Sequence, residues 1–338
     1  MILAGDVGGT KTVLGLFKQV GGALSPAREE TFPSREFSSL EGIFKEFLAR
    51  RGSRIHAVAV GVAGPIVDGR SDRVNLPWPV DRRRLARGLE VDRVCVINDL
   101  EATALGIPEL SPRRLLNLTP GLRARTGNAA LIAAGTGLGM ALLVRDGERY
   151  HASASEGGHL AFAPRDDLEI ALLRHLRRRH GRVSTERVVS GDGISSIYEF
   201  LAENSWGTPG SALRSKLGVA EDRNAAISQA GLDGRDRLAV KTLAMFVSLY
   251  GAAAGELALV SKATAGVYVG GGIAPRILPR LKSGEFVRAF RDKGRLAPLL
   301  EKIPVRVILE PRTALLGAAA HAARHAAGSP RRRVRRKR

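Results

Sequence analysis

The sequence is poor in cysteine and in long apolar runs. Its single cysteine, Cys95, excludes an internal disulfide and a zinc cluster built from cysteines. The longest apolar run, residues 129–144, is too short and too glycine-rich to cross a membrane. The first residues show no basic stretch followed by an apolar run and a cleavage site, so we expect no signal peptide. These absences favour a cytoplasmic protein with no membrane partner.

Acidic residues are also few relative to basic ones. The chain has 33 Asp and Glu against 53 Lys and Arg, and its net charge of +20 raises the hypothesis of nucleic-acid binding. Part of this excess is local, because residues 331–338 read RRRVRRKR. Blocks of like charge are usually solvated and disordered, and few aromatic residues separate the remaining arginines. We therefore expect a disordered basic tail at 328–338 that binds polyanions nonspecifically, rather than a dedicated nucleic-acid function.

Glycine is abundant, and it marks two similar hairpins. The sequence GDVGGTKT at 5–12 is one residue away from a P-loop, but apolar and β-branched residues follow it where a P-loop requires a helix. It therefore predicts a strand, a glycine turn and a second strand. Residues 129–144, AALIAAGTGLGMALLV, repeat this pattern around the turn at 135–137. Two such hairpins predict a duplicated architecture of two lobes, whose glycine turns face a cleft and bind phosphate oxygens.

A third glycine site lies at 266–277, in GVYVGGGIAPRI. A short strand enters Gly270-Gly271-Gly272, and a helix with Pro275 in its first turn is expected to follow. Without side chains, this backbone can approach a flat ligand such as adenine closely. A plain strand-to-helix turn is nearly as well supported by these residues alone.

Strands and helices alternate along the rest of the chain, which predicts the α/β class. Apolar periodicity indicates helices at 38–52, 100–106, 167–180, 237 to about 264, and 313–325. Apolar and β-branched runs indicate strands at 54–69, 92–99 and 305–309.

Asn98 and Asp99 come at the carboxyl end of one of these strands, where a helix begins. Ligands and catalytic groups gather at such strand ends in open α/β sheets. Asn and Asp are also preferred N-cap residues, so either one can serve only as a cap. The helix dipole is expected to favour the ionised form of Asp99.

Further polar groups suit a polyhydroxylated ligand. Glu156 and His159 flank two glycines in SEGGHLAFAP, although the histidine can equally be a core residue. Glu186 in STERVVSGDG can alternatively cap a helix, and Asn75 lies in the apolar segment NLPW. No second His or Cys lies near His159 with metal-ligand spacing, which argues against zinc. Hydroxyl ligands together with phosphate turns predict a polyhydroxylated substrate and a nucleotide.

Eight motifs together resemble the bacterial glucokinases of the hexokinase-like type, in order and in spacing. They are GDVGGTKT, AGPIVDG, NLPWPVD, INDLEATALG, AGTGLG, SEGGHLAFAP, STERVVSG and GGGIAPR. The resemblance covers about residues 2–325. It implies the two-lobed, ribonuclease H-like fold that actin and the heat-shock chaperone ATPases share, with a central cleft.

The resemblance implies phosphorylation of D-glucose to glucose 6-phosphate with ATP and Mg²⁺, at the entry to glycolysis. Asp99 resembles the general base that activates the 6-hydroxyl. The residues that resemble sugar ligands are Asn75, Asn98, Asp99, Glu156, His159 and Glu186. Those that resemble cofactor-binding residues are Asp6, Gly8, Gly9, Thr10, Lys11, Gly135, Thr136, Gly137 and Gly271. No direct protein ligand to the metal is expected, with Asp6 in the turn reaching Mg²⁺ through water.

The family also implies a homodimer, and a small lobe of residues 1–110 plus 312–326 beside a large lobe of residues 111–311. A sister family of sugar kinases carries a cysteine-rich zinc motif after its Glu–His pair, which Cys95 alone cannot supply. Two alternatives keep the kinase chemistry: another hexose, or another phosphoryl donor. A non-enzymatic sugar-sensing regulator is disfavoured, because the first strand begins at Ile2 without room for a DNA-binding module, and Asp99 and both turns are retained.

Overall fold

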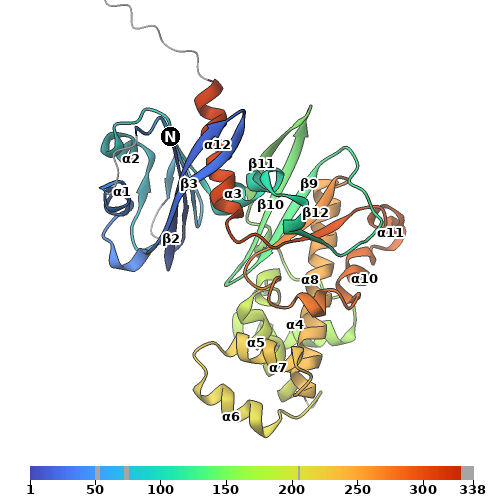
Figure 1. Ribbon diagram of the computed structural model, residues 1–338. Coiled ribbons are helices and arrows are strands. Elements are labelled where there is room, and N and C mark those ends of the chain that lie inside the picture. The colour runs from blue at the N-terminus through green and yellow to red at the C-terminus, as the bar shows by residue number, and fades with distance from the viewer. Residues whose placement is uncertain (50–53, 72–75, 205, 329–338) are drawn as a thin grey trace, which may run out of the picture. The chain divides into compact units, whose positions relative to one another are not determined.

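A computed structural model describes residues 1–49, 54–71, 76–204 and 206–328 (Figure 1). The chain divides into two compact units by its internal contacts. Unit 1 comprises residues 1–111 and 310–338, and unit 2 comprises residues 112–309. The polypeptide therefore leaves unit 1 once and returns to it for the last helix.

Unit 1 is built on a five-stranded sheet in the order β3-β2-β1-β4-β7. Its strands are β1 (Ile2–Val7), β2 (Lys11–Val20), β3 (Ala23–Pro33), β4 (Ala57–Val62) and β7 (Val94–Asn98). The first three form an antiparallel meander, whereas β4 and β7 run parallel to β1. Because parallel strands end at the same edge of a sheet, the carboxyl ends of β1, β4 and β7 lie together.

Helices cover both faces of this sheet. The elements are the 3-10 turn η1 (Ser34–Glu36), α1 (Leu40–Ala49), the short strands β5 (Arg70–Ser71) and β6 (Val80–Asp81), α2 (Arg82–Leu89), α3 (Asp99–Gly106), the 3-10 turn η2 (Ile107–Glu109) and α12 (Thr313–Gly328). Along β1, Leu3 belongs to the core that contains α1, whereas Ile2 and Ala4 pack against α12. Alanines on α12 let it lie close to the strands (Figure 1). A Cβ on Gly317 of α12 would be 1.8 Å from the carbonyl oxygen of Ala102, so only glycine permits the contact between α12 and α3.

Unit 2 repeats the topology of unit 1 in a six-stranded sheet, ordered β11-β10-β9-β12-β13-β8. Its strands are β8 (Leu115–Asn117), β9 (Ala129–Ala134), β10 (Leu138–Asp146), β11 (Arg149–Ser155), β12 (Gly266–Gly270) and β13 (Val305–Ile308). Again an antiparallel meander of three strands is followed by two parallel ones, and β8 is added antiparallel to β13. The duplication predicted from the two hairpins is confirmed.

The helical part of unit 2 is larger. It contains η3 (Pro112–Arg114), η4 (Gly157–His159), α4 (Asp167–His180), η5 (Thr185–Arg187), α5 (Gly191–Glu203), α6 (Ser211–Val219), α7 (Arg223–Leu232), α8 (Arg237–Ser261), α9 (Leu278–Leu281), α10 (Glu285–Arg291), η6 (Gly294–Leu296) and α11 (Ala297–Leu300). Figure 1 shows α4 to α7 grouped at one end of this unit. Among the described residues, α8 alone is long and apolar enough to cross a membrane, but 72% of that stretch is buried inside the protein.

The predicted helix with Pro275 in its first turn is wrong. Residues 271–277 form successive turns, and α9 begins only at Leu278. The amides of Arg276 and Ile277 both donate to the carbonyl oxygen of Ile273, and Pro275 has no amide to donate. The hydrogen bonds of this segment therefore close local turns.

Candidate functional site

The first glycine turn joins β1 to β2 in unit 1. Val7 pairs with Thr12 across this hairpin, and the amide of Gly8 donates to the carbonyl oxygen of Lys11 at 3.0 Å. A strand follows the turn, so the prediction of a hairpin in place of a P-loop is confirmed. Gly9 is partly exposed, and Thr10 and Lys11 are exposed, which leaves the turn open to a ligand.

Ser34 supports this turn, although sequence analysis did not single it out. Its hydroxyl donates to the carbonyl oxygen of Gly8 at 2.7 Å and lies 2.9 Å from the hydroxyl of Thr12. Its amide donates to the carbonyl oxygen of Thr10 at 3.0 Å. Trp78 in turn donates its indole N–H to the carbonyl oxygen of Ser34 at 3.3 Å. Ser34 therefore stabilises the turn from a distant part of the sequence, and a local sequence pattern does not reveal this function.

Asp6 lies in β1, one residue before its end, and not in the turn as expected. It pairs with Val13 of β2 and with Gly61 of β4. Burial raises the pKa of Asp6 above its usual value, and Lys11 opposes this only in part. A carboxylate whose charge is poorly solvated favours a nearby cation.

Asn98 is the N-cap of α3. Its side-chain oxygen accepts hydrogen bonds from the amides of Leu100 at 2.8 Å and Glu101 at 3.3 Å. Its amide group donates to the carbonyl oxygen of Gly64 at 3.0 Å, which ties the end of β7 to the loop after β4. Of the two residues that sequence analysis considered as caps, Asn98 performs that function.

Asp99 is the first residue of α3 and lies where three parallel strands end. Its carboxylate accepts a hydrogen bond from the amide of Leu100 at 3.0 Å. Burial, followed by the charge of Asp6, raises the pKa of Asp99 to about 6. The helix end does favour the ionised form through the amide of Leu100, as expected, but the loss of solvation is the larger effect and sets the direction of the shift. A carboxyl with a pKa near 6 is suited to accept a proton at neutral pH.

The second glycine turn joins β9 to β10 in unit 2. The amide of Gly135 donates to the carbonyl oxygen of Gly137 at 2.8 Å. The carbonyl oxygen of Gly135 accepts from the amide of Gly191, the first residue of α5, also at 2.8 Å. The turn therefore lies beside the N-terminus of a helix of 13 residues, where an anion is favoured.

Glu186 is bound to this turn. Its carboxylate accepts from the amide of Leu138 at 2.8 Å, and a Cβ on Gly137 would be 2.5 Å from the same oxygen. The alternative that Glu186 caps a helix is wrong, because it lies inside η5 and its own carboxylate bonds to β10. Oε2 of Glu186 is hydrogen-bonded to the turn, whereas Oε1 lies on the side of His159.

Glu156 and His159 lie beside Glu186. The His159 ring nitrogens are 3.9 Å from Glu156 Oε2 and 4.0 Å from Glu186 Oε1. The side chain of His159 is 58% exposed, so the alternative of a core histidine is wrong. The structure thus brings together three predicted sugar ligands and one glycine turn in unit 2. Asn75, the remaining predicted ligand, lies outside the described residues.

A cavity of about 630 Å³ opens next to Gly135 and Thr136. Its other lining residues are Gly191, Asp192, Ile194, Asp222, Asn224, Ala225, Ser228, Gln229, Leu232, Gly272, Ile273, Arg276 and Ile277. Gly271 precedes the cavity-lining Gly272, and with φ at +82° its Cβ would be 2.2 Å from the carbonyl oxygen of Ala134, so only glycine fits beside the end of β9. Gly135 and Thr136 were predicted from the sequence, whereas Gly191 and the polar residues from α5 and α7 were not.

Tyr250 fixes the strand ends beneath the cavity. Its buried hydroxyl accepts from the amide of Ala134 at 3.1 Å and lies 3.2 Å from the carbonyl oxygen of Gly270. It therefore joins β9 to β12 at the point where both glycine segments begin.

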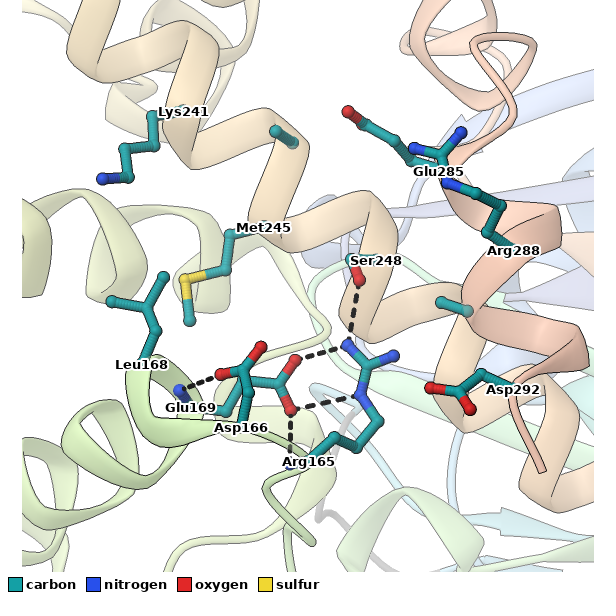
Figure 2. Close-up of a pocket in the computed structure, with 12 residues that line it drawn as sticks. Arg165, Asp166, Leu168, Glu169, Lys241, Met245, Ser248, Glu285, Arg288 and Asp292 are labelled. Carbon is teal, nitrogen blue, oxygen red and sulfur yellow. Dashed lines mark hydrogen bonds and ion pairs between the residues drawn. The ribbon is translucent and has the colours of Figure 1, made fainter. Parts of the chain in front are cut away.

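A second cavity of unit 2, about 580 Å³, contains none of the predicted site residues (Figure 2). Figure 2 shows Arg165 between Glu169 and Ser248, with its guanidinium 2.9 Å from the Ser248 hydroxyl. Glu169 is buried and Arg165 is its ion-pair partner. These interactions join α4 to α8, which is a structural function.

Known proteins with similar sequences identify the family. A glucokinase family model matches residues 3–325. The chain is 40% identical over 339 residues to a glucokinase of Trichormus variabilis, which covers 96% of this chain and 99% of that protein. The chain belongs to the glucokinase family. It is therefore a sugar kinase, and glucose phosphorylation is the activity of that family.

Solved structures agree with this assignment to the glucokinase family. A glucokinase from an Antarctic psychrotroph matches with a TM-score of 0.82 and 32% identity, over 96% of this chain and 98% of that one. A ROK family glucokinase from Streptomyces griseus, solved with glucose and AMPPNP, matches with a TM-score of 0.62 over 96% of this chain and 99% of that one. At 22% identity, the second match supports the fold alone. The predicted actin-like ATPase fold is confirmed.

Proposed function

We propose that this glucokinase-family chain transfers the γ-phosphoryl group of ATP to the 6-hydroxyl of D-glucose, with Asp99 as the general base. The observation that carries the proposal is that Asp99 has a raised pKa and is not needed as a helix cap. Its pKa is raised to about 6, and Asn98 relieves it of the capping function. A carboxylate of this kind is available for proton transfer at neutral pH.

In this reaction Asp99 accepts the proton of the 6-hydroxyl as that oxygen bonds to phosphorus and the bond to the ADP oxygen breaks. Such a proton transfer contributes roughly 10²–10⁴-fold to the rate. Burial and, after it, the charge of Asp6 raise the pKa of Asp99. A positive charge near the two carboxylates would lower the pKa of Asp99.

We propose that Glu156, His159 and Glu186 of unit 2 and Asn98 of unit 1 hydrogen-bond the other sugar hydroxyls, with Asn75 as an additional ligand. Carboxylates accept from hydroxyl groups, and a ring N–H donates to one. Holding several hydroxyls at once orients the sugar, and orientation of the reacting oxygen is a major part of catalysis.

We propose that the cavity beside Gly135 and Thr136 holds the nucleoside of ATP. Its volume of about 630 Å³ suits a nucleotide, and Gly272, which lines it beside Gly271, lets a flat base approach the backbone. The amides of the two glycine turns, at 8–10 and 135–137, are then the donors to phosphate oxygens. Lys11 is exposed beside the first turn and supplies a positive charge.

Mg²⁺ is the cofactor that the donor set fits. Asp6 offers a hard oxygen ligand, and burial raises its pKa more than Lys11 lowers it, so a nearby cation would stabilise its charged form. Mg²⁺ usually keeps several waters and binds substrate phosphates, so contact with Asp6 through water is consistent with its chemistry. When bound, the ion neutralises charge on the β- and γ-phosphates.

We further propose that the chain belongs to the hexokinase-like branch of its family, outside the ROK branch. The support is its single cysteine, since the ROK zinc motif is cysteine-rich. We also propose a cytoplasmic homodimer. Sedimentation of the purified protein as a monomer would contradict the dimer.

The test is a panel of initial rates. Glucose, mannose, fructose and galactose are each combined with ATP, ADP or polyphosphate, in the presence of Mg²⁺, and sugar phosphate is measured. We expect glucose with ATP to give the highest kcat/KM. A higher value for another sugar or another donor would replace that part of the proposal, and no sugar phosphate from any pair would overturn it.

A further inference from the structure

Three potential metal ligands meet in unit 1 outside the proposed reaction. The sulfur of Cys95 and one ring nitrogen from each of His321 and His325 all lie within 4.8 Å of one another. Cysteine and histidine are the ligands that zinc and similar transition metals prefer. None of the three has a function in sugar phosphorylation as proposed above.

The fold explains how these residues come together. Cys95 lies on β7, the edge strand, in register with Ala59 of β4 and on the sheet face that α12 covers. His321 and His325 are one helical turn apart on α12, so they share a face, and their ring centroids are 4.6 Å apart. Two histidines spaced by four residues on a helix are a known arrangement for zinc.

Contacts that involve no metal ligand hold α12 against the sheet and against the segment before β7. Ala322 of α12 is buried against the sheet, between the two histidines in sequence. Next to β7, the guanidinium of Arg93 donates to the carbonyl oxygen of Ala326, near the end of α12, at 2.7 Å. The backbones that carry the ligands are thus fixed by interactions that do not depend on a metal.

The distances are close to those of a coordinated ion. With Zn–N of about 2.05 Å and Zn–S of about 2.3 Å, tetrahedral geometry places two nitrogens about 3.4 Å apart and nitrogen and sulfur about 3.5 Å apart. Ligand atoms already within 4.8 Å need to approach by little more than about 1 Å, which side-chain rotation provides.

We propose that Cys95, His321 and His325 bind one transition-metal ion of the zinc class, with water as the remaining ligand. A cavity of about 490 Å³ lies against Cys95 and His321, and it gives room for that water and a route for the ion. Arg82 lines the same cavity, but burial has the larger effect and raises the pKa of the Cys95 thiol, so the metal itself would have to displace that proton. His325 is exposed, which also permits exchange with solvent.

A bound ion would join α12 to the edge strand of the sheet. The same strand ends at Asn98, but the ion takes no part in proton or phosphoryl transfer. The expected effect of binding is therefore a higher melting temperature, which rises with metal concentration. The Mg²⁺-dependent rate of glucose phosphorylation should be unchanged when the site is emptied.

The experiment uses tag-free, full-length protein that has been stripped with a chelator and dialysed. Zn²⁺ is titrated against a chromophoric competitor, and Co²⁺ is added separately to record the visible and near-ultraviolet spectrum. We expect about one equivalent of Zn²⁺ and a thiolate-to-cobalt charge-transfer band. Zn²⁺ binding by the wild-type protein at no more than the level of a non-chelating reference protein would overturn the proposal.

Variants identify the ligands. Cys95→Ser should remove the cobalt band, and both Cys95→Ser and His325→Gln should weaken Zn²⁺ binding by at least about 10-fold. His180→Gln, in unit 2, is the matched control and should leave binding unchanged. Since His325 is exposed, its variant should fold even if Cys95→Ser does not. Undiminished binding by His325→Gln would show that the metal is held elsewhere.

Discussion

Replacing Asp99 with asparagine tests the proposed base, because the two possible functions of this residue predict opposite results. Asparagine preserves the shape and the hydrogen bond from the amide of Leu100, but it cannot accept the proton of the 6-hydroxyl. We expect kcat to fall by at least about 100-fold. Glucose affinity should change much less, since other residues bind the remaining hydroxyls.

The structure also predicts the effect on stability. The pKa of Asp99 is raised from 3.8 to about 6, so the folded protein holds this proton more tightly than the unfolded chain. The resulting stabilisation is present below pH 3.8 and is lost as the pH rises through about 6. A shift of about two units corresponds to at most about 3 kcal/mol. Asparagine carries no charge, so at pH 7 the free energy of unfolding should stay constant or increase by up to about that amount.

The assay is kcat at saturating ATP and glucose, together with glucose affinity and a thermal melt. Asp81→Asn is the matched control: Asp81 is also at a helix N-terminus, where it accepts from the amides of Arg83 at 2.7 Å and Arg84 at 3.0 Å. Asparagine is an equally good cap, so kcat of the control should be unchanged. An Asp99→Asn variant that keeps more than a tenth of the wild-type kcat would end the assignment of the base.

Three further predictions concern pH, metal and the tail. The kcat/KM for glucose should fall on acidification as Asp99 takes up its proton, with a midpoint at about 6 or below it if the bound cation lowers this pKa, and a rate that stays constant down to about pH 4 in the folded enzyme would contradict its function as a base. Removal of Mg²⁺ should abolish phosphorylation, whereas a zinc-selective chelator should leave it intact; full activity without any divalent cation would refute this. Deletion of 329–338 should weaken retention on a polyanion column and leave kcat almost unchanged, and a tenfold fall in kcat of the folded, truncated enzyme would count against that expectation.

Local patterns predicted the elements that carry the proposed chemistry. The helix expected at 167–180 is α4, Asp167–His180, because its apolar residues recur with helical spacing. Both glycine hairpins were predictable, since β-branched and apolar residues on each side favour strands. The sugar-ligand candidates Glu156 and His159 stood out because polar residues flank a glycine pair.

Contacts between distant segments were not predictable in this way. Ser34 supports the first glycine turn, and Tyr250 joins β9 to β12, but neither belongs to a motif near its partners. The net shift of the Asp99 pKa was unpredictable for a related reason: the following helix lowers it as expected, but the larger effects, burial and the charge of Asp6, come from packing. The approach of His321 to Cys95 likewise depends on the return of α12 to unit 1.

The central claim is that this chain transfers phosphate from ATP to the 6-oxygen of glucose. The most direct measurement is phosphorus and carbon NMR of glucose, ATP and Mg²⁺ incubated with the purified wild-type protein, with Asp99→Asn in parallel. The account predicts glucose 6-phosphate and ADP in equal amounts with the wild-type protein, and almost none with the variant. Hydrolysis of ATP without sugar phosphate, or phosphate on a different hydroxyl, would contradict it.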